Sequence, residues 1–418
     1  MRTRREWLAL AAVSAAAQSS GENIRIGFIG VGSRGTGLLK NLLTRADADV
    51  PAVCDIDPKS VKRAQDLVKE FKGHVPAGFD KGPDDYRRLL ARTDLQAVLI
   101  ATPQEDHARM SIDAMKAGKF VASEVPACTT IDECWELVRT QRKTKSGYML
   151  LENYRYGEPV MQVANMAEKG LFGELTYAEC CYIHEIRDMR FNKDGSLTWR
   201  GENVRRNIGD IYPTHSVGPV CGWMGVNRTD RLVSLVTMAS KSAALEEYAT
   251  RRFGKDSPQA KIKFLNGDTN NTLIRTALGR LIAVRYDTAS PRPAGMGQYS
   301  LQGTRGAYLS AFGEHKVFIE GRSKPHTWEP LDAYRAEYQH PYWAQRGEEA
   351  RKSGHGGGDY FVLADMLVAV RTGQSPIDVY DAATWSSIRP LSALSLQRGS
   401  APVDIPDFKN AEPLPLKK

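Results

Sequence analysis

A glycine-rich stretch, Gly30-Val31-Gly32-Ser33-Arg34-Gly35, has the residue types and spacing of a turn that binds the pyrophosphate of a dinucleotide. It directly follows the apolar run 24–29 and directly precedes a helix-like run. In such a strand–turn–helix unit, Gly30 makes the tight turn, Gly32 lets a phosphate approach the main chain, and Gly35 lets the helix pack on the strand. The start of the helix presents free N–H groups and the positive end of its dipole to the phosphates. The stretch therefore predicts a dinucleotide site that includes Ser33 and Arg34.

A carboxylate follows the glycine-rich stretch at the sequence spacing that a dinucleotide site requires. The second apolar run, 50–54, ends at Asp55, about 20 residues beyond the last glycine, where an acid binds the hydroxyls of the adenosine ribose. Its negative charge would repel a 2′-phosphate, so the sequence favours NAD over NADP. The alternative interpretation is an ordinary glycine turn followed by a solvated acidic loop.

Three later apolar runs also end in polar residues suited to a cofactor. Because ligands collect at the carboxyl ends of parallel strands, we expect Thr102, Gln104 and His107 beside the nicotinamide ribose and the pyrophosphate. Glu124-Val125 suits a contact with the nicotinamide ribose or amide, and Asn153 suits a similar contact. Core or helix-capping roles are the alternative for Glu124 and Asn153. The three runs are 95–101, 119–123 and 149–151.

The order of the elements predicts an α/β chain with two domains. Apolar strands that alternate with helices make residues 23–153 a Rossmann dinucleotide-binding domain, whose parallel sheet is buried on both faces. Strand-like runs then follow one another without helices, so residues 154–418 are expected to form an α+β domain with a large open, mostly antiparallel sheet. Helices near the C-terminus could return to the first domain. The long polar segment 188–207 is expected to be a lid or binding loop.

Composition and charge exclude several classes of protein. The chain has 418 residues, of which 42% are hydrophobic, enough for two domains with substantial cores. Its net charge of +8 comes from basic residues scattered among acids, without a basic stripe interleaved with aromatics, so nucleic-acid binding is not expected. The six cysteines lack paired metal-ligand spacing, and His184 has no second histidine at helical spacing. No metal site is therefore expected.

The first 22 residues are interpreted as a leader and linker. Arg4 and Arg5 precede a short apolar run, and Ala15-Ala16-Ala17 offers an A-x-A cleavage site. The paired arginines resemble a twin-arginine export signal, so the protein is expected in the periplasm. The apolar run is too short to span a bilayer, and no membrane association is expected. The alternative is a cytoplasmic protein with an alanine-rich start.

Taken together, the motifs after residue 22 resemble the glucose-fructose oxidoreductase / inositol dehydrogenase (Gfo/Idh/MocA) superfamily. Gly30–Gly35, Thr102-Pro103, His107 and Glu124-Val125-Pro126 fall in its order. Within it, the chain is most similar to the NAD-dependent α-N-acetylgalactosaminidases of glycosyl hydrolase family 109. The motifs that carry this closer resemblance are Leu151-Glu152-Asn153, Tyr182-Ile183-His184, Trp199-Arg200, Tyr212-Pro213-Thr214-His215, Gly303-Thr304 and Gly354-His355-Gly356-Gly357.

The resemblance implies a redox-neutral glycosidase that keeps NAD bound and needs no pair of catalytic carboxylates. His215, whose unperturbed pKa is about 6.5, suits removal of the proton from the sugar 3-hydroxyl. Tyr182 and Tyr212 would bind hydroxyls or remove the proton from C2. The remaining candidates for substrate binding are Arg200, Pro213, Thr214 and Tyr299. The alternatives are a structural histidine, ordinary interface tyrosines, and a surface ion pair for Arg200.

Two departures bear on the chemistry. Dehydrogenases of the superfamily have Glu-Lys-Pro, but Val125 stands in place of the lysine and cannot move a proton, which disfavours simple alcohol oxidation. Where the glycosidase branch has a tyrosine after a Pro-Arg-Pro element, this chain has Ala294, and Tyr299 is the suggested substitute. The rival functions are an NAD-dependent sugar or polyol dehydrogenase and a non-catalytic nucleotide sensor. The expected partners are a small-molecule or glycan substrate and a second copy of the chain across the open sheet.

Overall fold

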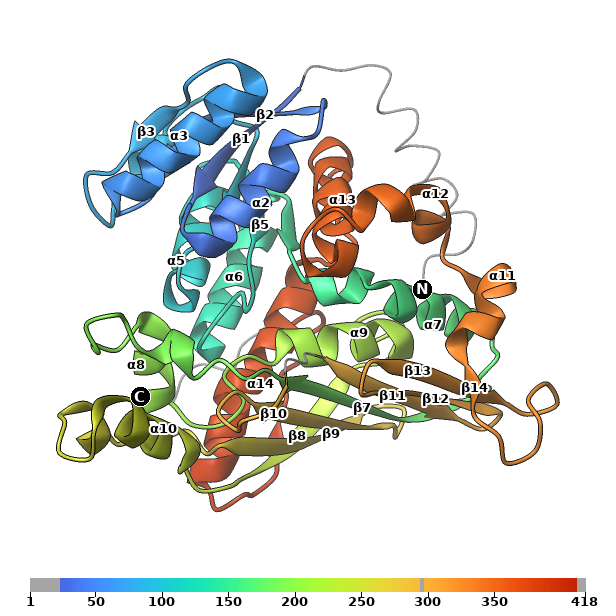
Figure 1. Ribbon diagram of the computed structural model, residues 1–418. Coiled ribbons are helices and arrows are strands. Elements are labelled where there is room, and N and C mark those ends of the chain that lie inside the picture. Colours follow the sequence, from blue (N-terminus) through green and yellow to red (C-terminus); the bar gives the residue numbers. More distant parts are fainter. Residues whose placement is uncertain (1–22, 294–296, 412–418) are drawn as a thin grey trace. The chain divides into compact units, whose positions relative to one another are not determined.

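The computed structural model describes residues 23–293 and 297–411. The expected leader, 1–22, and Ala294 lie outside the described residues. The chain divides into two compact units, and Figure 1 shows the elements of each. Within the described residues, the first unit comprises 23–158 and 341–383, and the second comprises 159–340 and 384–411. The division falls inside helix α14 (Val379–Gln397).

The first unit is built on a six-stranded parallel sheet of order β3-β2-β1-β4-β5-β6. The order of the strands reverses between β1 and β4: β2 and β3 follow on one side of β1, and β4, β5 and β6 on the other. Open α/β sheets bind nucleotides at such a point. Helices α2, α3 and α13 pack together in one group, and α5 packs with α6 in another (Figure 1). The elements are β1 (Ile24–Ile29), α2 (Ser33–Leu43), β2 (Ala48–Cys54), α3 (Pro58–Lys72), β3 (Ala77–Phe79), α4 (Tyr86–Leu90), β4 (Ala97–Ile100), α5 (Gln104–Lys116), β5 (Phe120–Ser123), α6 (Ile131–Thr144), β6 (Tyr148–Leu150), η1 (Asn153–Tyr156), α12 (Pro341–Ala350), η5 (His355–Gly357) and α13 (Gly358–Thr372).

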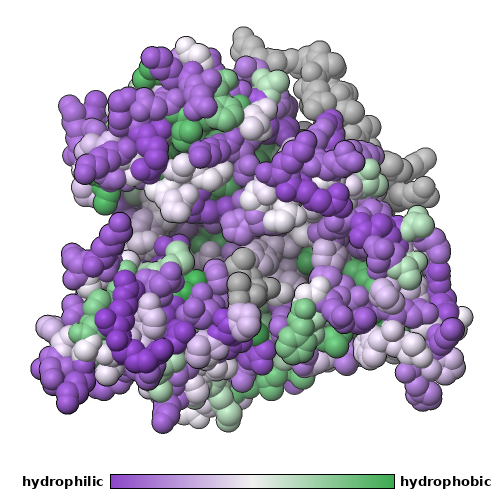
Figure 2. All heavy atoms as spheres, in the orientation of Figure 1, coloured by the Kyte–Doolittle hydropathy of each residue, from purple (hydrophilic) through white to green (hydrophobic). Residues whose placement is uncertain are grey.

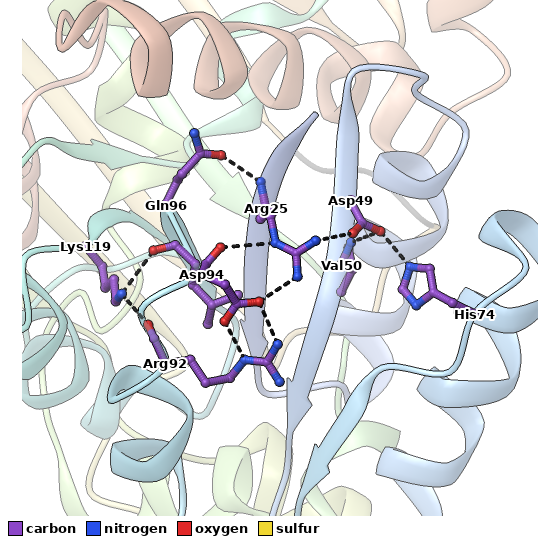
Figure 3. Close-up of polar contacts among 9 residues, drawn as sticks. Arg25, Asp49, Val50, His74, Arg92, Asp94, Gln96 and Lys119 are labelled. Atoms are coloured by element: carbon purple, nitrogen blue, oxygen red, sulfur yellow. Dashed lines mark hydrogen bonds and ion pairs between the residues drawn. The ribbon is translucent and has the colours of Figure 1, made fainter. Parts of the chain in front are cut away.

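A polar network closes the amino-terminal edge of this sheet (Figure 3). Arg25, at the start of β1, donates from its guanidinium to Asp49 at the start of β2 and to Asp94 just before β4. Lys119, just before β5, donates its ammonium protons to the main-chain oxygen of Leu95 at 3.0 Å. These contacts satisfy polar groups where the strands begin, at the end of the sheet opposite the glycine turn. We interpret this network as structural.

The second unit is built on a nine-stranded sheet of order β14-β13-β12-β11-β7-β10-β9-β8-β15, and α9 packs on β7, β10 and β11 (Figure 1). Neighbouring strands are antiparallel, except that β10 pairs with β7 in parallel. The elements are α7 (Glu158–Glu168), β7 (Leu175–Ile183), η2 (Asp188–Arg190), α8 (Trp199–Arg206), α9 (Thr214–Met224), β8 (Leu232–Ala239), α10 (Ala244–Phe253), η3 (Gln259–Lys261), β9 (Thr269–Thr276), β10 (Leu281–Asp287), β11 (Gln298–Gly303), β12 (Gly306–Ala311), β13 (Glu314–Ile319), β14 (Glu329–Pro330), η4 (Leu331–Tyr334), α11 (Arg335–Tyr338) and β15 (Val403–Asp404).

The predicted fold class is confirmed, and one detail differs from the sequence-based expectation. Segment 188–207 is not a plain loop, because it contains η2 and α8. Residues 341–383 belong to the first unit, as the sequence left open for helices near the C-terminus, and α13 packs there on α2 and η1 through buried apolar and polar side chains. The face drawn in Figure 2 is largely polar, with small apolar areas between polar side chains. Among the described helices, none has the length and apolar character to cross a bilayer.

Candidate functional site

The glycine turn lies at the carboxyl end of β1 and has no room for side chains at two positions. Gly30 has φ +87°, and a Cβ there would lie 2.7 Å from the main chain of Ala101. A Cβ on Gly35 would lie 1.9 Å from the carbonyl oxygen of Gly30. A Cβ on Gly32, at the start of α2, would meet nothing within 4 Å. The turn therefore packs α2 tightly on the strand and leaves open space beside Gly32, as a bound pyrophosphate requires.

Asp55 follows β2 and fastens the turn to the neighbouring strand. One carboxylate oxygen accepts a hydrogen bond from the main-chain N–H of Val31 at 2.8 Å, and the other accepts one from Asp57 at 3.0 Å. Arg63, in α3, donates to the carbonyl oxygen of Val31 at 3.0 Å. The predicted ribose-binding acid therefore lies against the glycine turn, where a nucleotide would meet both.

His107 joins the loops that follow β4 and β5. Its Nδ1 lies 2.8 Å from the carbonyl oxygen of Pro126, its Nε2 lies 2.8 Å from that of Thr102, and its side chain is buried. The ring is thus held between two main-chain oxygens, so it fixes the loop that carries Thr102 and Gln104. Direct contact between these three residues and the cofactor stays a prediction.

Glu124, Val125 and Asn153 are all buried in the first unit. Glu124 accepts hydrogen bonds from the Arg34 Nε at 2.6 Å and from the main-chain N–H of Val125 at 3.2 Å. The Asn153 amide nitrogen donates to Asp359, whereas its oxygen has no hydrogen-bond partner among the described residues. An unsatisfied buried acceptor needs a donor, and a nicotinamide amide or a ribose hydroxyl supplies one. These residues fit an NAD nucleotide.

In the second unit, three predicted catalytic residues form one aromatic cluster. The Tyr182 ring centroid lies 5.1 Å from that of Tyr212 and 5.5 Å from that of His215, and the Tyr212 and His215 centroids are 4.9 Å apart. Tyr182 comes from β7 and His215 from the first turn of α9, which packs on β7. The two tyrosines and the histidine can therefore act on one bound molecule.

The main chain around His215 is held from two sides. Pro213 precedes α9, and its carbonyl oxygen accepts the N–H groups of Ser216 and Val217 at 3.0 Å each. Tyr299, in β11, donates its hydroxyl to the carbonyl oxygen of His215 at 2.6 Å. The structure thus shows Tyr299 supporting the histidine's main chain, and its direct contact with substrate stays a prediction. Thr214 is buried, and its hydroxyl has no partner among the described residues.

His184 and Arg190 join the cluster. The sequence analysis named His184 only as part of a motif and gave neither residue a role in catalysis or substrate binding. The Tyr182 hydroxyl lies 3.0 Å from Nδ1 of His184. Burial, and then the neighbouring His215, lowers the pKa of His184, which keeps its imidazole in the neutral form. Alternate residues of a strand lie on the same face, so the spacing of residues 182 and 184 was the sequence signal that could have placed His184 beside Tyr182. Arg190 donates to Thr288 at 2.7 Å, a contact between distant segments that no local pattern indicates.

Arg200 adds a second cation to this region. Its guanidinium carbon lies 4.2 Å from the ring centroid of Trp199, and no carboxylate pairs with it in the described part of the chain. Burial lowers the pKa of Arg200, while the nearby hydroxyls of Tyr212 and Tyr182 act to raise it. A cation without a carboxylate, close to both tyrosines, can bind sugar oxygens or stabilise negative charge.

Asp210 is a buried acid two residues before Tyr212. One of its oxygens accepts the N–H of Tyr212 at 3.1 Å, and the other has no partner among the described residues. Burial raises the pKa of Asp210 to about 7, although Arg389 and the Tyr212 hydrogen bond act to lower it. The loop that carries Tyr212 and His215 therefore starts at a carboxyl group that titrates near neutrality.

Comparisons with known proteins agree with this geometry. Residues 24–151 match the family described as "Oxidoreductase family, NAD-binding Rossmann fold", and residues 156–413 match "Glycosyl hydrolase 109, C-terminal domain". A glycosyl hydrolase family 109 protein of Stenotrophomonas maltophilia (strain K279a) is 38% identical, over 97% of this chain and 95% of the relative. An alpha-N-acetylgalactosaminidase of Tannerella forsythia is 37% identical, over 93% of this chain and 87% of the relative.

A solved structure shares the fold. Levoglucosan dehydrogenase in complex with NADH and L-sorbose superimposes with a TM-score of 0.74 and 20% identity, covering 92% of this chain and 100% of that one. Together, the family matches and the fit of the first unit's residues identify NAD as the cofactor.

We expect Gly35→Ala to lower both NAD retention and thermal stability, because the new Cβ would clash with the Gly30 carbonyl and push α2 away from the turn. The matched control is Gly37→Ala in the same helix, where a Cβ would meet nothing within 4 Å. That variant should be neutral, or more stable by roughly 0.5–1 kcal/mol. Nucleotide released from the purified variants and their melting temperatures are the measurements. Equal NAD content in the two variants would contradict the assigned role of Gly35.

We expect Asp210→Asn to change how stability depends on pH. Between the unfolded pKa of about 4 and the folded value of about 7, the native state binds a proton that the unfolded state has released, so stability falls as pH rises. An asparagine has no such proton. Between pH 5 and pH 8, the free energy of unfolding of the variant should therefore rise by on the order of 2 kcal/mol relative to that of the parent. Urea denaturation at both pH values measures this, and parallel pH profiles would rule out the raised pKa.

Proposed function

This chain belongs to glycosyl hydrolase family 109 and is an NAD-dependent glycosidase, and we propose that its substrates are α-linked N-acetylgalactosaminides or related hexosides. The observation that carries the proposal is the cluster of Tyr182, Tyr212 and His215, with Arg200 near both tyrosines. The similarity to the alpha-N-acetylgalactosaminidase of Tannerella forsythia supports the choice of sugar.

The proposed mechanism assigns two proton transfers, from the 3-hydroxyl and from C2 of the sugar, to groups of this chain. NAD, when bound, supplies a hydride acceptor for C3 of the sugar and later returns the hydride, so that no net oxidation occurs. His215 takes the proton of the 3-hydroxyl. Arg200 binds the sugar's oxygens through its fork of donors. Val125, buried where a dehydrogenase of this superfamily has its lysine, moves no proton.

Tyr182 is the proposed base for the C2 proton, which a ketone at C3 makes acidic. Its hydroxyl lies 3.0 Å from Nδ1 of His184, whose lowered pKa keeps the imidazole neutral, so the two side chains can share a hydrogen bond that orients the phenol. The guanidinium of Arg200 interacts electrostatically with Tyr182 and can stabilise negative charge that develops beside it. Loss of the C2 proton lets the aglycone leave C1 by elimination. Addition of water to C1 and return of a proton to C2 then give the 3-keto sugar, and a hydride returned to C3 with the proton held by His215 would give the free sugar.

The assay that tests this function is incubation of the purified protein with p-nitrophenyl α-N-acetylgalactosaminide. We expect release of nitrophenol without accumulation of NADH. His215→Ala should lower the rate by roughly 10²–10⁴-fold while NAD stays bound, because a positioned proton acceptor is lost. The exposed His326→Ala is the control and should keep the parent rate. Steady NADH formation from a free sugar, with no nitrophenol released, would instead identify a dehydrogenase.

We also propose that two copies of the chain associate through the open face of the second unit's sheet. Exposed apolar side chains lie on its strands β8, β9, β10 and β12, namely Met238, Leu273, Leu281 and Leu309. Burying such side chains between two copies is favourable. Leu273→Arg should therefore lower the molar mass measured by light scattering to that of one chain. Leu278→Arg, in the turn that follows β9, should keep the larger mass, and a parent protein that is monomeric would exclude the proposal.

Export to the periplasm through the twin-arginine route is likewise proposed, on the strength of Arg4 and Arg5 before a short apolar run. Replacing both arginines by lysine should retain the protein in the cytoplasm, because that route reads the arginine pair as an address. Cell fractionation followed by immunoblotting measures the distribution, and unchanged export of the variant would refute this route.

A further inference from the structure

Arg190, the last residue of η2, binds the start of α8 through its buried side chain. One terminal nitrogen donates to the main-chain carbonyl oxygen of Arg200 at 3.0 Å, and the other donates to the hydroxyl oxygen of Thr288 at 2.7 Å. Thr288 directly follows the last residue of β10. Arg190 therefore ties the first turn of α8 to the end of a strand in the second unit's sheet.

The main chain of Arg190 contacts the same turn of α8. Its carbonyl oxygen accepts the N–H of Thr198, the residue before the helix, at 3.0 Å. A Cβ on Gly201 would lie 2.3 Å from that oxygen, so glycine at this position lets the helix come this close. Arg200 lies between Thr198 and Gly201 in the chain and accepts the side-chain hydrogen bond itself. Its main chain is thus fixed, and with it the point from which its side chain extends.

Thr288 connects this arrangement to the tyrosines of the candidate site. Its hydroxyl oxygen lies 3.0 Å from that of Tyr286. The Tyr286 ring stacks on the ring of Tyr182, with centroids 6.4 Å apart and an interplanar angle of 14°. All three side chains are buried, so they have little freedom to rearrange. A continuous series of contacts therefore joins Arg200, through Arg190, to the tyrosine proposed as the C2 base.

The guanidinium of Arg190 is buried against uncharged oxygens. Its side chain is 3% exposed, both of its acceptors are neutral, and its Nε has no hydrogen-bond partner among the described residues. Burying a charge in this way is costly. Burial, and to a smaller degree the charge of Arg190, lowers the pKa of Arg200, so the two cations lie close enough to repel each other. A neutral side chain could fix α8 at a lower cost, which indicates that the arginine serves the site.

We propose that Arg190 is a positioning residue for the sugar, because it fixes the main chain of Arg200 where the Arg200 guanidinium binds the substrate's oxygens. A planar guanidinium suits this task, since it can donate to two oxygens at once in a set geometry. The proposal rests on the proposed function, which assigns Arg200 to substrate binding. It concerns affinity for the sugar and not for NAD, whose binding residues belong to the first unit.

The test is Arg190→Met in the full chain, assayed with p-nitrophenyl α-N-acetylgalactosaminide at saturating NAD. We expect KM to rise by about tenfold, as the loss of hydrogen bonds from a charged donor implies, with a smaller change in kcat and the parent's NAD content. Arg190→Lys keeps the charge without the fork of donors and should not restore KM. The matched control is Arg206→Met, an exposed arginine of the same helix paired with Glu202, which should keep the parent KM.

A double-mutant cycle separates positioning from a merely structural role. If Arg190 acts through Arg200, then Arg190→Met should change KM little in a chain that already carries Arg200→Met. Additive effects on KM, or the parent KM in Arg190→Met, would overturn the proposal and leave the proposed function standing. The parent KM in Arg200→Met would instead remove the sugar-binding role of Arg200, and its positioning by Arg190 with it.

Two further measurements keep the proposal falsifiable. If Arg190→Met does not fold, Thr288→Val decides, because it removes one acceptor and leaves the contact with Arg200 in place. That variant should raise KM several-fold, and the parent KM would count against the proposal. Hydrogen exchange by mass spectrometry needs no substrate: amides of residues 197–206 should exchange faster in the variant than in the parent. Exchange at the parent rate there would overturn the proposal whatever the sugar.

Discussion

The contact between α2 and the end of β1 is the constraint on which the cofactor site depends. Because a Cβ on Gly35 would lie 1.9 Å from the Gly30 carbonyl, the helix can come this close only with glycine at that position. This close packing puts Arg34 where its guanidinium reaches both Glu124 and Asp359. A shift of the helix would therefore disturb the phosphate-binding turn and the carboxylates beside it together.

The second unit contains the side chains that move protons in the proposed reaction, which uses no pair of catalytic carboxylates. Its candidate acids and bases are ring side chains. Tyr182, Tyr212 and His215 contact one another, and the Tyr182 hydroxyl lies 3.0 Å from Nδ1 of His184. Arg190 and Arg200 make the surroundings positive. Preorganised positive charge stabilises an oxyanion or enolate as it forms, which is where elimination from an oxidised sugar needs help. Asp210, a buried acid at the start of the loop, has a pKa that burial raises to about 7.

Local patterns were sufficient to predict much of the fold. The strand–turn–helix at Gly30, the acid Asp55 and the change from alternating strands and helices to successive strands are all readable from neighbouring residues. β1 has the expected bounds, Ile24–Ile29. The parallel pairing of β7 with β10, by contrast, joins segments about a hundred residues apart, and no local pattern encodes it.

The same reasoning explains which site residues were found. Tyr182, Tyr212 and His215 lie in recognisable motifs, and the structure brings them together. The ion pair between Arg34 and Asp359 was not expected, because it joins residues 325 positions apart and no local pattern indicates it. Asp210 was missed because its raised pKa comes from burial, which sequence alone does not report.

The central claim is that the glycosidic bond breaks by elimination after oxidation of the sugar at C3. Running the hydrolysis in deuterated water and examining the released sugar by NMR tests this most directly, because the C2 proton must leave and be replaced during each turnover. Our account predicts deuterium at C2 of the product, with no NADH accumulating. A product that keeps its original hydrogen at C2 would contradict it.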